Sequence, residues 1–316
     1  MSLFIRRTAT AASLALMSLI MTAGAQAEDK VLRVGIQKYG KLILLKTRGT
    51  LEKKLGGLGY KVTWTEFPAG PQLLEALNVG AIDFGNTGEA PPIFAQAAGA
   101  PILYVAYEPP APRGEAILVP KDSPIKTLAD VKGKKVALNK GSNVHFLLVK
   151  ALEKAGVAYS EIQPTFLTPA DARAAFERGA VDAWAIWDPF LAAAEAATGA
   201  RTLANGEGIV SNHQFYLSSR QFAAENPKAV QAVLEELRGL DEWVKNDTKA
   251  AAPQLSASTG IPAPVLEVAL SRQTYGIAPL GDDAVAAQQA IADTFHALGL
   301  LPKPVSIAGA VWRAGS

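Results

Sequence analysis

The polar residues best placed to do chemistry stand where apolar runs end and helices begin. In KGSNVHFLLVKAL, Ser142 occupies the expected N-cap of a helix, Asn143 is its first residue and His145 lies in its first turn. The first N–H groups of a helix lack partners and carry partial positive charge, so they offer a site for an anion. An ordinary capped helix explains the same residues, and both interpretations stay open here.

A second helix start of this kind is the segment GNTGEAPP. Thr87 offers a hydroxyl group, and Gly88 lets a ligand approach the backbone. Pro91 and Pro92 fit the first helical turn, where no N–H donor is needed. Glu89 is a candidate ligand residue, although a carboxylate that stabilises the first turn of a helix explains it equally well.

The segment DAWAIWDPF predicts a strand that ends beside a ligand. Trp187 follows the last strand residue, Ile186, and in α/β proteins ligands bind at the carboxyl ends of strands. The indole can cover an organic group and donate one hydrogen bond. Trp184 fits a packed core position better. Asp188 is most simply an N-cap, and it is also a candidate binding residue.

Two amides complete the set of candidate residues. Gln37 ends the first predicted strand, and its neutral amide can donate to an anion; Lys38 is more simply a solvated surface group. Gln214 begins a later apolar strand and is a weaker candidate. A hydrogen bond to a charged group contributes about 1.5 to 3 kcal/mol, and a micromolar complex needs about 8 kcal/mol. Four or five neutral donors therefore suffice without an arginine.

These residues must be positioned by alternating strands and helices, which is typical of an α/β protein. Two apolar strands, near residues 115–120 and 214–218, are expected to carry the chain into a second lobe and back. We therefore predict lobe 1 at residues 28–115 and 215–316, lobe 2 at 116–214, and a ligand cleft between them. The predicted strands are 31–36, 61–67, 82–85, 115–120, 135–138, 165–167, 181–186, 201–203 and 214–218. The predicted helices include 42–55, 262–270 and 282–298, one through Leu73, Leu74 and Leu77, and others that begin near 143, 170, 189 and 226.

The first 27 residues predict a cleavable signal peptide and export to the periplasm. Arg6 and Arg7 precede a short apolar run, and Ala25-Gln26-Ala27 fits the small-x-small cleavage pattern, with cleavage between Ala27 and Glu28. The alternative is an uncleaved anchor helix. Cleavage would leave 29 of the 31 basic residues against 29 acidic residues, a formally neutral chain. This balance does not favour a nucleic-acid partner.

Composition and motifs also argue against several kinds of site. The chain has no cysteine, so disulfides, thiolate metal sites and cysteine nucleophiles are excluded. Its three histidines, His145, His213 and His296, show no metal-ligand spacing, and no cofactor is expected. The motifs GxSxG, GxxxxGK[ST] and a strand-linked GxGxxG are all missing. We expect a binding protein rather than an enzyme.

Four segments resemble the aliphatic sulfonate-binding protein of the sulfonate ABC importer: EFPAGPQLLEALNVGAIDFGNTGEAPPIFAQAAGA, KGSNVH, LTPADARAAF and VDAWAIWDPF. The resemblance implies a periplasmic binding protein-like type II fold, in which two α/β lobes joined by a two-strand hinge close over the ligand. It further implies a monomer that delivers an alkyl- or arylsulfonate to a membrane permease and, through it, serves an ATPase. By position, the implied donors are Gln37, Thr87, Gly88, Ser142, Asn143 and His145, with Trp187 beside the tail and Gln214 as a weaker candidate.

Related proteins leave alternative ligands open. Nitrate, bicarbonate and taurine binders resemble this group and share its plan. Taurine requires a partner for its ammonium group, and Glu89 or Asp188 is the candidate. Pyrimidine-synthase enzymes share the fold too, but they use a cysteine-rich segment with iron, whereas this chain has no cysteine.

Overall fold

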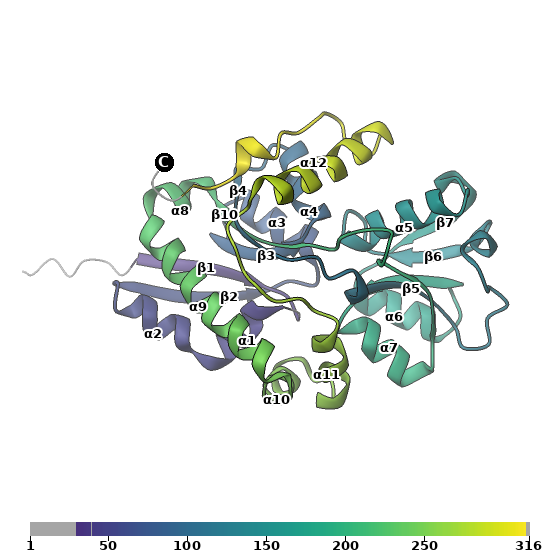
Figure 1. The fold of residues 1–316 in the computed structure, drawn as a ribbon, viewed down its shortest axis with the longest axis horizontal. Helices are drawn as coiled ribbons and strands as arrows, with labels where there is room; N and C mark the ends of the chain where they lie inside the picture. Colours follow the sequence, from purple (N-terminus) through teal and green to yellow (C-terminus); the bar gives the residue numbers. More distant parts are fainter. Residues whose placement is uncertain (1–29, 39, 314–316) are drawn as a thin grey trace, which may run out of the picture.

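The computed structural model describes residues 30–38 and 40–313, which form two mixed five-stranded sheets flanked by helices (Figure 1). The predicted α/β class is confirmed. The first sheet has the order β2-β1-β3-β10-β4 and contains β1 (Lys30–Ile36), β2 (Tyr60–Glu66), β3 (Phe84–Gly88), β4 (Ile102–Glu108) and β10 (Gln214–Ser219). The second has the order β7-β6-β8-β5-β9 and contains β5 (Glu115–Val119), β6 (Lys135–Leu138), β7 (Gln163–Phe166), β8 (Ala183–Trp187) and β9 (Arg201–Asn205).

The chain passes between the two sheets twice among the described residues. It leaves the first sheet after β4 and returns to it at β10. The strands that receive it, β5 and β10, pair antiparallel with their neighbours, whereas β1, β2 and β3 pair in parallel, as do β6, β7 and β8. We keep the predicted lobe boundaries near residues 115 and 214 as a proposal, and we call the two sheets with their helices lobe 1 and lobe 2.

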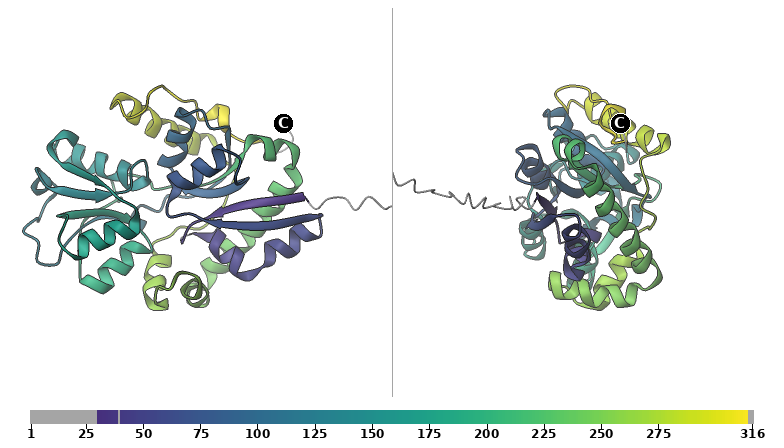
Figure 2. Two further views of the ribbon diagram at one scale, coloured as in Figure 1. Left: turned by 180° about the vertical axis from the view of Figure 1, so that it is seen from behind. Right: turned by 90° about the vertical axis from the view of Figure 1, so that its left-hand side faces the viewer.

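Helices cover both faces of each sheet, and the two lobes lie side by side in the view from behind (Figure 2). Lobe 2 contains α5 (Asn143–Lys154), α6 (Pro169–Glu177) and α7 (Phe190–Thr198). The other helices are α1 (Lys41–Arg48), α2 (Thr50–Gly56), α3 (Gly70–Asn78), α4 (Ala90–Ala97), α8 (Arg220–Glu225), α9 (Pro227–Asn246), α10 (Thr248–Thr259), α11 (Ala263–Ser271) and α12 (Asp282–Ala297). None of the helices in the described ranges combines the length and the apolar character that crossing a bilayer requires.

Each sheet buries apolar side chains on both faces, because successive residues of a strand point to opposite sides. In β5, Ile117 and Val119 join one apolar cluster, whereas Ala116 and Leu118 join another. All four side chains are at most 1% exposed. A strand buried on both faces forms a rigid support for the loops at its ends, and these loops carry the polar candidates.

Several predicted elements differ from the structure. The expected helix 42–55 is two helices, because Gly49 adopts a left-handed conformation with φ 64°. Strand β3 runs from residue 84 to 88 rather than from 82 to 85, since it pairs with β10 as far as Gly88. Strand β4 and helix α10 were not predicted. Asn226 precedes α9 as expected, but its side chain accepts a hydrogen bond from Tyr60 instead of capping the helix.

Candidate functional site

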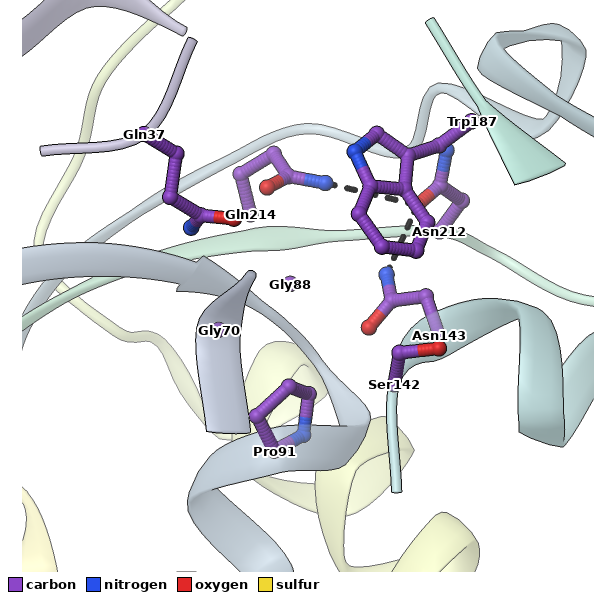
Figure 3. A pocket seen from close by; sticks show the side chains of 9 residues that line it. All are labelled: Gln37, Gly70, Gly88, Pro91, Ser142, Asn143, Trp187, Asn212 and Gln214. Atoms are coloured by element: carbon purple, nitrogen blue, oxygen red, sulfur yellow. Dashed lines mark hydrogen bonds between the residues drawn. The ribbon is translucent and has the colours of Figure 1, made fainter. Parts of the chain in front are cut away.

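A pocket between the two lobes collects residues from strand ends and helix starts (Figure 3). It encloses about 350 Å³ of empty space, part of which is open to solvent. The carboxyl ends of β1, β3 and β8 meet here, as expected for an α/β protein with parallel strands. The lining residues are Gln37, Gly70, Gly88, Pro91, Ser142, Asn143, Trp187, Asn212 and Gln214.

Two predicted donors line the pocket with part of their hydrogen-bonding capacity already used. The Gln37 amide donates to the backbone oxygen of Asn86 at 2.9 Å, which leaves one N–H of the amide group. The Ser142 hydroxyl donates its single hydrogen to the backbone oxygen of Asn139 at 2.7 Å. It also makes no capping hydrogen bond to α5, contrary to the expected N-cap role. In this arrangement Ser142 offers an acceptor, not a donor.

Asn143 joins the two lobes across the pocket. Its Oδ1 accepts a hydrogen bond from the backbone N–H of Ala90, at the start of α4, at 3.0 Å. Its Nδ2 donates to Oδ1 of Asn212 at 2.7 Å. The carboxamide lies so close to Gly88 that a Cβ atom at that glycine would be 2.2 Å from both Asn143 Nδ2 and Oδ1. Only glycine at position 88 permits this contact between the lobes.

Asn212 is a pocket residue that was not predicted. It lies in the segment that returns the chain to lobe 1, and its φ of 52° falls in the left-handed region, which asparagine tolerates better than most residues. Its side chain donates to the backbone oxygen of Ala111 at 2.8 Å, and its Oδ1 also accepts from Gln214 at 3.3 Å. Asn212 therefore bonds to the segment that leaves lobe 1, at Ala111, and to two amides that line the pocket, those of Asn143 and Gln214. Gly70 and Pro91 were likewise not predicted as lining residues.

Four predicted residues lie outside the lining of the pocket. Thr87 is fully buried, and its hydroxyl donates to the backbone oxygen of Gly88 at 3.0 Å. Glu89 is also fully buried. Its carboxylate accepts from the Ser211 hydroxyl at 2.7 Å and from the backbone N–H of His213 at 2.8 Å, so it ties the start of α4 to the returning segment. The other two are His145 and Asp188.

His145 supports the loop behind Ser142. Its Nδ1 accepts a hydrogen bond from the backbone N–H of Gly141 at 3.2 Å, and its Nε2 lies 3.0 Å from the hydroxyl oxygen of Tyr159. Burial and the nearby charge of Lys140 lower the pKa of His145 to about 4. The ring is therefore neutral at physiological pH and carries its proton on Nε2, toward Tyr159.

Asp188 holds the helix that follows Trp187. Its Oδ1 accepts a hydrogen bond from the backbone N–H of Ala192 at 3.1 Å, which satisfies a donor in the first turn of α7. Burial raises the pKa of Asp188 to about 6, although Arg272, 3.4 Å away, opposes this shift. Because Arg272 follows α11, the pair also links α7 of lobe 2 to the C-terminal helices.

The comparison with known families gives a match over residues 59–250 to a family described as NMT1/THI5 like. The chain belongs to this family. A relative named as an aliphatic sulfonates-binding protein, from Escherichia coli strain K12, is 47% identical over 291 residues, or 92% of this chain and 91% of the relative. The predicted family resemblance is thereby confirmed.

Two solved structures resemble this chain in both fold and sequence. The alkanesulfonate-binding protein SsuA from Xanthomonas axonopodis pv. citri, bound to MOPS, superposes with a TM-score of 0.87 at 48% identity and covers 91% of this chain and 100% of its own. The periplasmic aliphatic sulphonate binding protein SsuA from Escherichia coli gives a TM-score of 0.81 at 47% identity and covers 90% and 98%. The predicted periplasmic binding protein-like fold is confirmed.

The chain also buries a carboxyl group, that of Glu115, on a strand of the second sheet. Both oxygens of Glu115, the first residue of β5, are buried and find no hydrogen-bond partner within residues 30–38 and 40–313. Burial, together with the negative charge of Glu89, raises the pKa of Glu115 well above its usual value near 4.5. Glu115 therefore keeps its proton in the folded chain over a pH range in which an unfolded chain has released it.

This raised pKa predicts a pH dependence of stability. Because the folded state binds the extra proton, the free energy of unfolding should fall as the pH rises above about 4.5. Glu115→Gln removes the titrating group, so its melting temperature should fall less than that of the unmodified chain between pH 4 and pH 7. Scanning calorimetry across this range measures the difference. The exposed Glu242→Gln serves as control, and parallel curves for Glu115→Gln and the unmodified chain would contradict the expected shift.

Within residues 30–38 and 40–313, no three His, Cys, Asp or Glu side chains are grouped so that they could hold a metal ion.

The predicted cleavage site between Ala27 and Glu28 lies outside these residues.

Proposed function

We propose that this chain is the periplasmic substrate-binding component of an ABC importer. It captures aliphatic sulfonates between its lobes and delivers them, without chemical change, to a membrane permease that is driven by its ATPase. It acts as a monomer and uses no cofactor. Export by a signal peptide cleaved between Ala27 and Glu28 is part of this proposal. The kinship with sulfonate-binding proteins over almost the whole chain supports it.

The observation that carries the proposal is the uncharged lining of a pocket formed by both lobes. Each lining residue is a neutral polar residue, a glycine, a proline or a tryptophan. Neutral N–H groups can hold an anion through charge-assisted hydrogen bonds, each contributing about 1.5 to 3 kcal/mol. Four such bonds contribute about 6 to 12 kcal/mol, a range that includes the roughly 8 kcal/mol of a micromolar complex.

We propose two roles for the predicted site residues. Gln37, Gly88, Asn143, Trp187 and Gln214 line the pocket and contact the ligand directly. The residues outside the lining hold these groups in place, as the bonds of Glu89 to the returning segment illustrate. Residues in this supporting role are Thr87, Glu89, His145 and Asp188, and we add Asn212 to the lining set.

The lining favours a sulfonate without an ammonium group over taurine. An ammonium group needs a carboxylate or several oxygen acceptors when it leaves water. Neither Glu89 nor Asp188 lines the pocket, and both carboxylates accept hydrogen bonds from protein groups. Taurine would therefore bury its cation without a carboxylate partner.

Isothermal titration calorimetry of residues 28–316 tests the proposal. We expect micromolar or tighter binding of ethanesulfonate and butanesulfonate, and binding of taurine at least tenfold weaker. Nitrate and bicarbonate, which lack an organic tail for Trp187 to cover, should bind more weakly still. Tight binding of nitrate combined with no binding of any sulfonate would refute the proposed function.

A further inference from the structure

We propose that an apolar groove beside the pocket receives the organic tail of the ligand, which makes long-chain alkyl- and arylsulfonates the preferred substrates. This inference rests on the proposed function. The groove, called the tail groove below, runs between α3 and α4 of lobe 1 and is also lined by Lys140 and Gly141 of lobe 2. Its empty space is about 690 Å³, part of it open to solvent, compared with about 350 Å³ for the pocket.

The tail groove and the pocket adjoin at three helix starts. At the start of α3, Gly70 lines the pocket and its neighbour Pro71 lines the groove. Before α5, Ser142 lines the pocket and Gly141 lines the groove. At the start of α4, Pro91 lines both. The tail groove therefore begins beside the pocket, on the far side of Pro91.

The chemistry of the tail groove suits an uncharged, apolar tail. Leu74, Phe94 and Ala95 contribute apolar surface between the two helices. The charged lining residues, Glu75 and Lys140, are exposed and lie where the groove meets solvent. A tail in the groove would cover apolar side chains that water now contacts, and the stabilisation would grow with each methylene group that is buried.

A competing route for the tail is less favourable. A smaller cavity is lined by Lys38, Gly40, Pro189, Gln273 and residues of α10 and α11. It has about 260 Å³ of empty space and shares no lining residue with the pocket. The tail groove is larger, and it shares the lining residue Pro91 with the pocket.

Titration calorimetry with methane-, ethane-, butane-, hexane- and benzenesulfonate tests this assignment on the unmodified chain and on Ala95→Trp. Ala95 is half-buried on α4, and a tryptophan there fills the tail groove. In the unmodified chain, the dissociation constant should fall up to about fourfold for each added methylene group, as expected for burial of one CH₂. In Ala95→Trp, affinity for methanesulfonate should stay within about twofold, and the gain with chain length should disappear.

A control variant and the pattern of outcomes distinguish the claim about the tail groove from the proposed function. Val79→Trp adds the same side chain to an exposed position after α3 that does not line the groove, so its chain-length gain should match that of the unmodified chain. If Ala95→Trp does not fold, Ala95→Leu is the smaller replacement and should reduce the gain. An undiminished gain in the folded groove variant would overturn the tail groove and leave the proposed function intact. No binding of any sulfonate to the unmodified chain would overturn both.

Discussion

Replacement of Gly88 by alanine should weaken ethanesulfonate binding by at least about 100-fold in titration calorimetry. A Cβ atom at this position would be 2.2 Å from the Asn143 carboxamide, a distance that real Cβ contacts do not show. Asn143 would have to move, and its hydrogen bonds to Ala90 and Asn212 would be lost. Since the bond to Ala90 joins the two lobes and the bond to Asn212 holds the carboxamide in place, the lobes could no longer close around the ligand in the same way.

A double-mutant cycle shows whether the collision causes the loss of affinity. Asn143→Ala removes the group that the new methyl group would strike, so adding Gly88→Ala to that variant should cost much less than adding it to the unmodified chain. Gly239→Ala is the matched control, because a Cβ atom at Gly239 meets nothing within 4 Å. Additive effects of the two pocket substitutions would show that the Gly88 contact with Asn143 is not the cause.

Replacement of Lys41 by methionine should lower the free energy of unfolding by about 3 to 5 kcal/mol. The Lys41 side chain is 2% exposed, and its ammonium group lies 2.5 Å from Glu108 and 2.9 Å from Asp241. Methionine has a similar shape but no charge, so two buried carboxylates would lose their cation. Glu108 also accepts a hydrogen bond from Tyr216, which does not neutralise it. Urea unfolding followed by circular dichroism measures the loss.

An exposed ion pair gives the comparison for Lys41. Lys54 lies 3.0 Å from Glu235, and both side chains are more than 40% exposed. Lys54→Met should leave the urea-unfolding midpoint almost unchanged, because surface ion pairs contribute little. Equal small effects of both substitutions would mean that the buried network does not depend on the Lys41 charge.

The sequence predicted elements well where a local pattern decides them. Strand β6 matches its predicted range, because an apolar run stands between turn residues on both sides. Strand β4 was missed because nearly all of its residues are buried, so it lacks the alternation that marks a strand. Helix α10 was missed because Pro253 lies inside it. The extension of β3 to Gly88 depends on pairing with β10, more than 100 residues later, for which local sequence gives no signal.

The difference between local patterns and contacts with distant segments also explains which candidate site residues line the pocket. Gln37 and Trp187 were predicted from their places at strand ends, and both line it. Glu89 and His145 stand at helix starts as predicted, but their side chains point to other partners, which no spacing rule reveals. Asn212 belongs to the pocket only because the chain crosses back between the lobes at this point. An asparagine before a strand indicates a turn, not a contact with another lobe.

The central claim is that a sulfonate head group binds between the lobes, in a pocket lined by uncharged residues at the ends of strands and the starts of helices. A crystal structure of residues 28–316 with bound ethanesulfonate tests it most directly. We expect the sulfonate oxygens within hydrogen-bond distance of Gln37 or Gly88 in lobe 1 and of Asn143 or Trp187 in lobe 2. A sulfonate bound to one lobe only, or held by charged side chains elsewhere on the surface, would contradict this account.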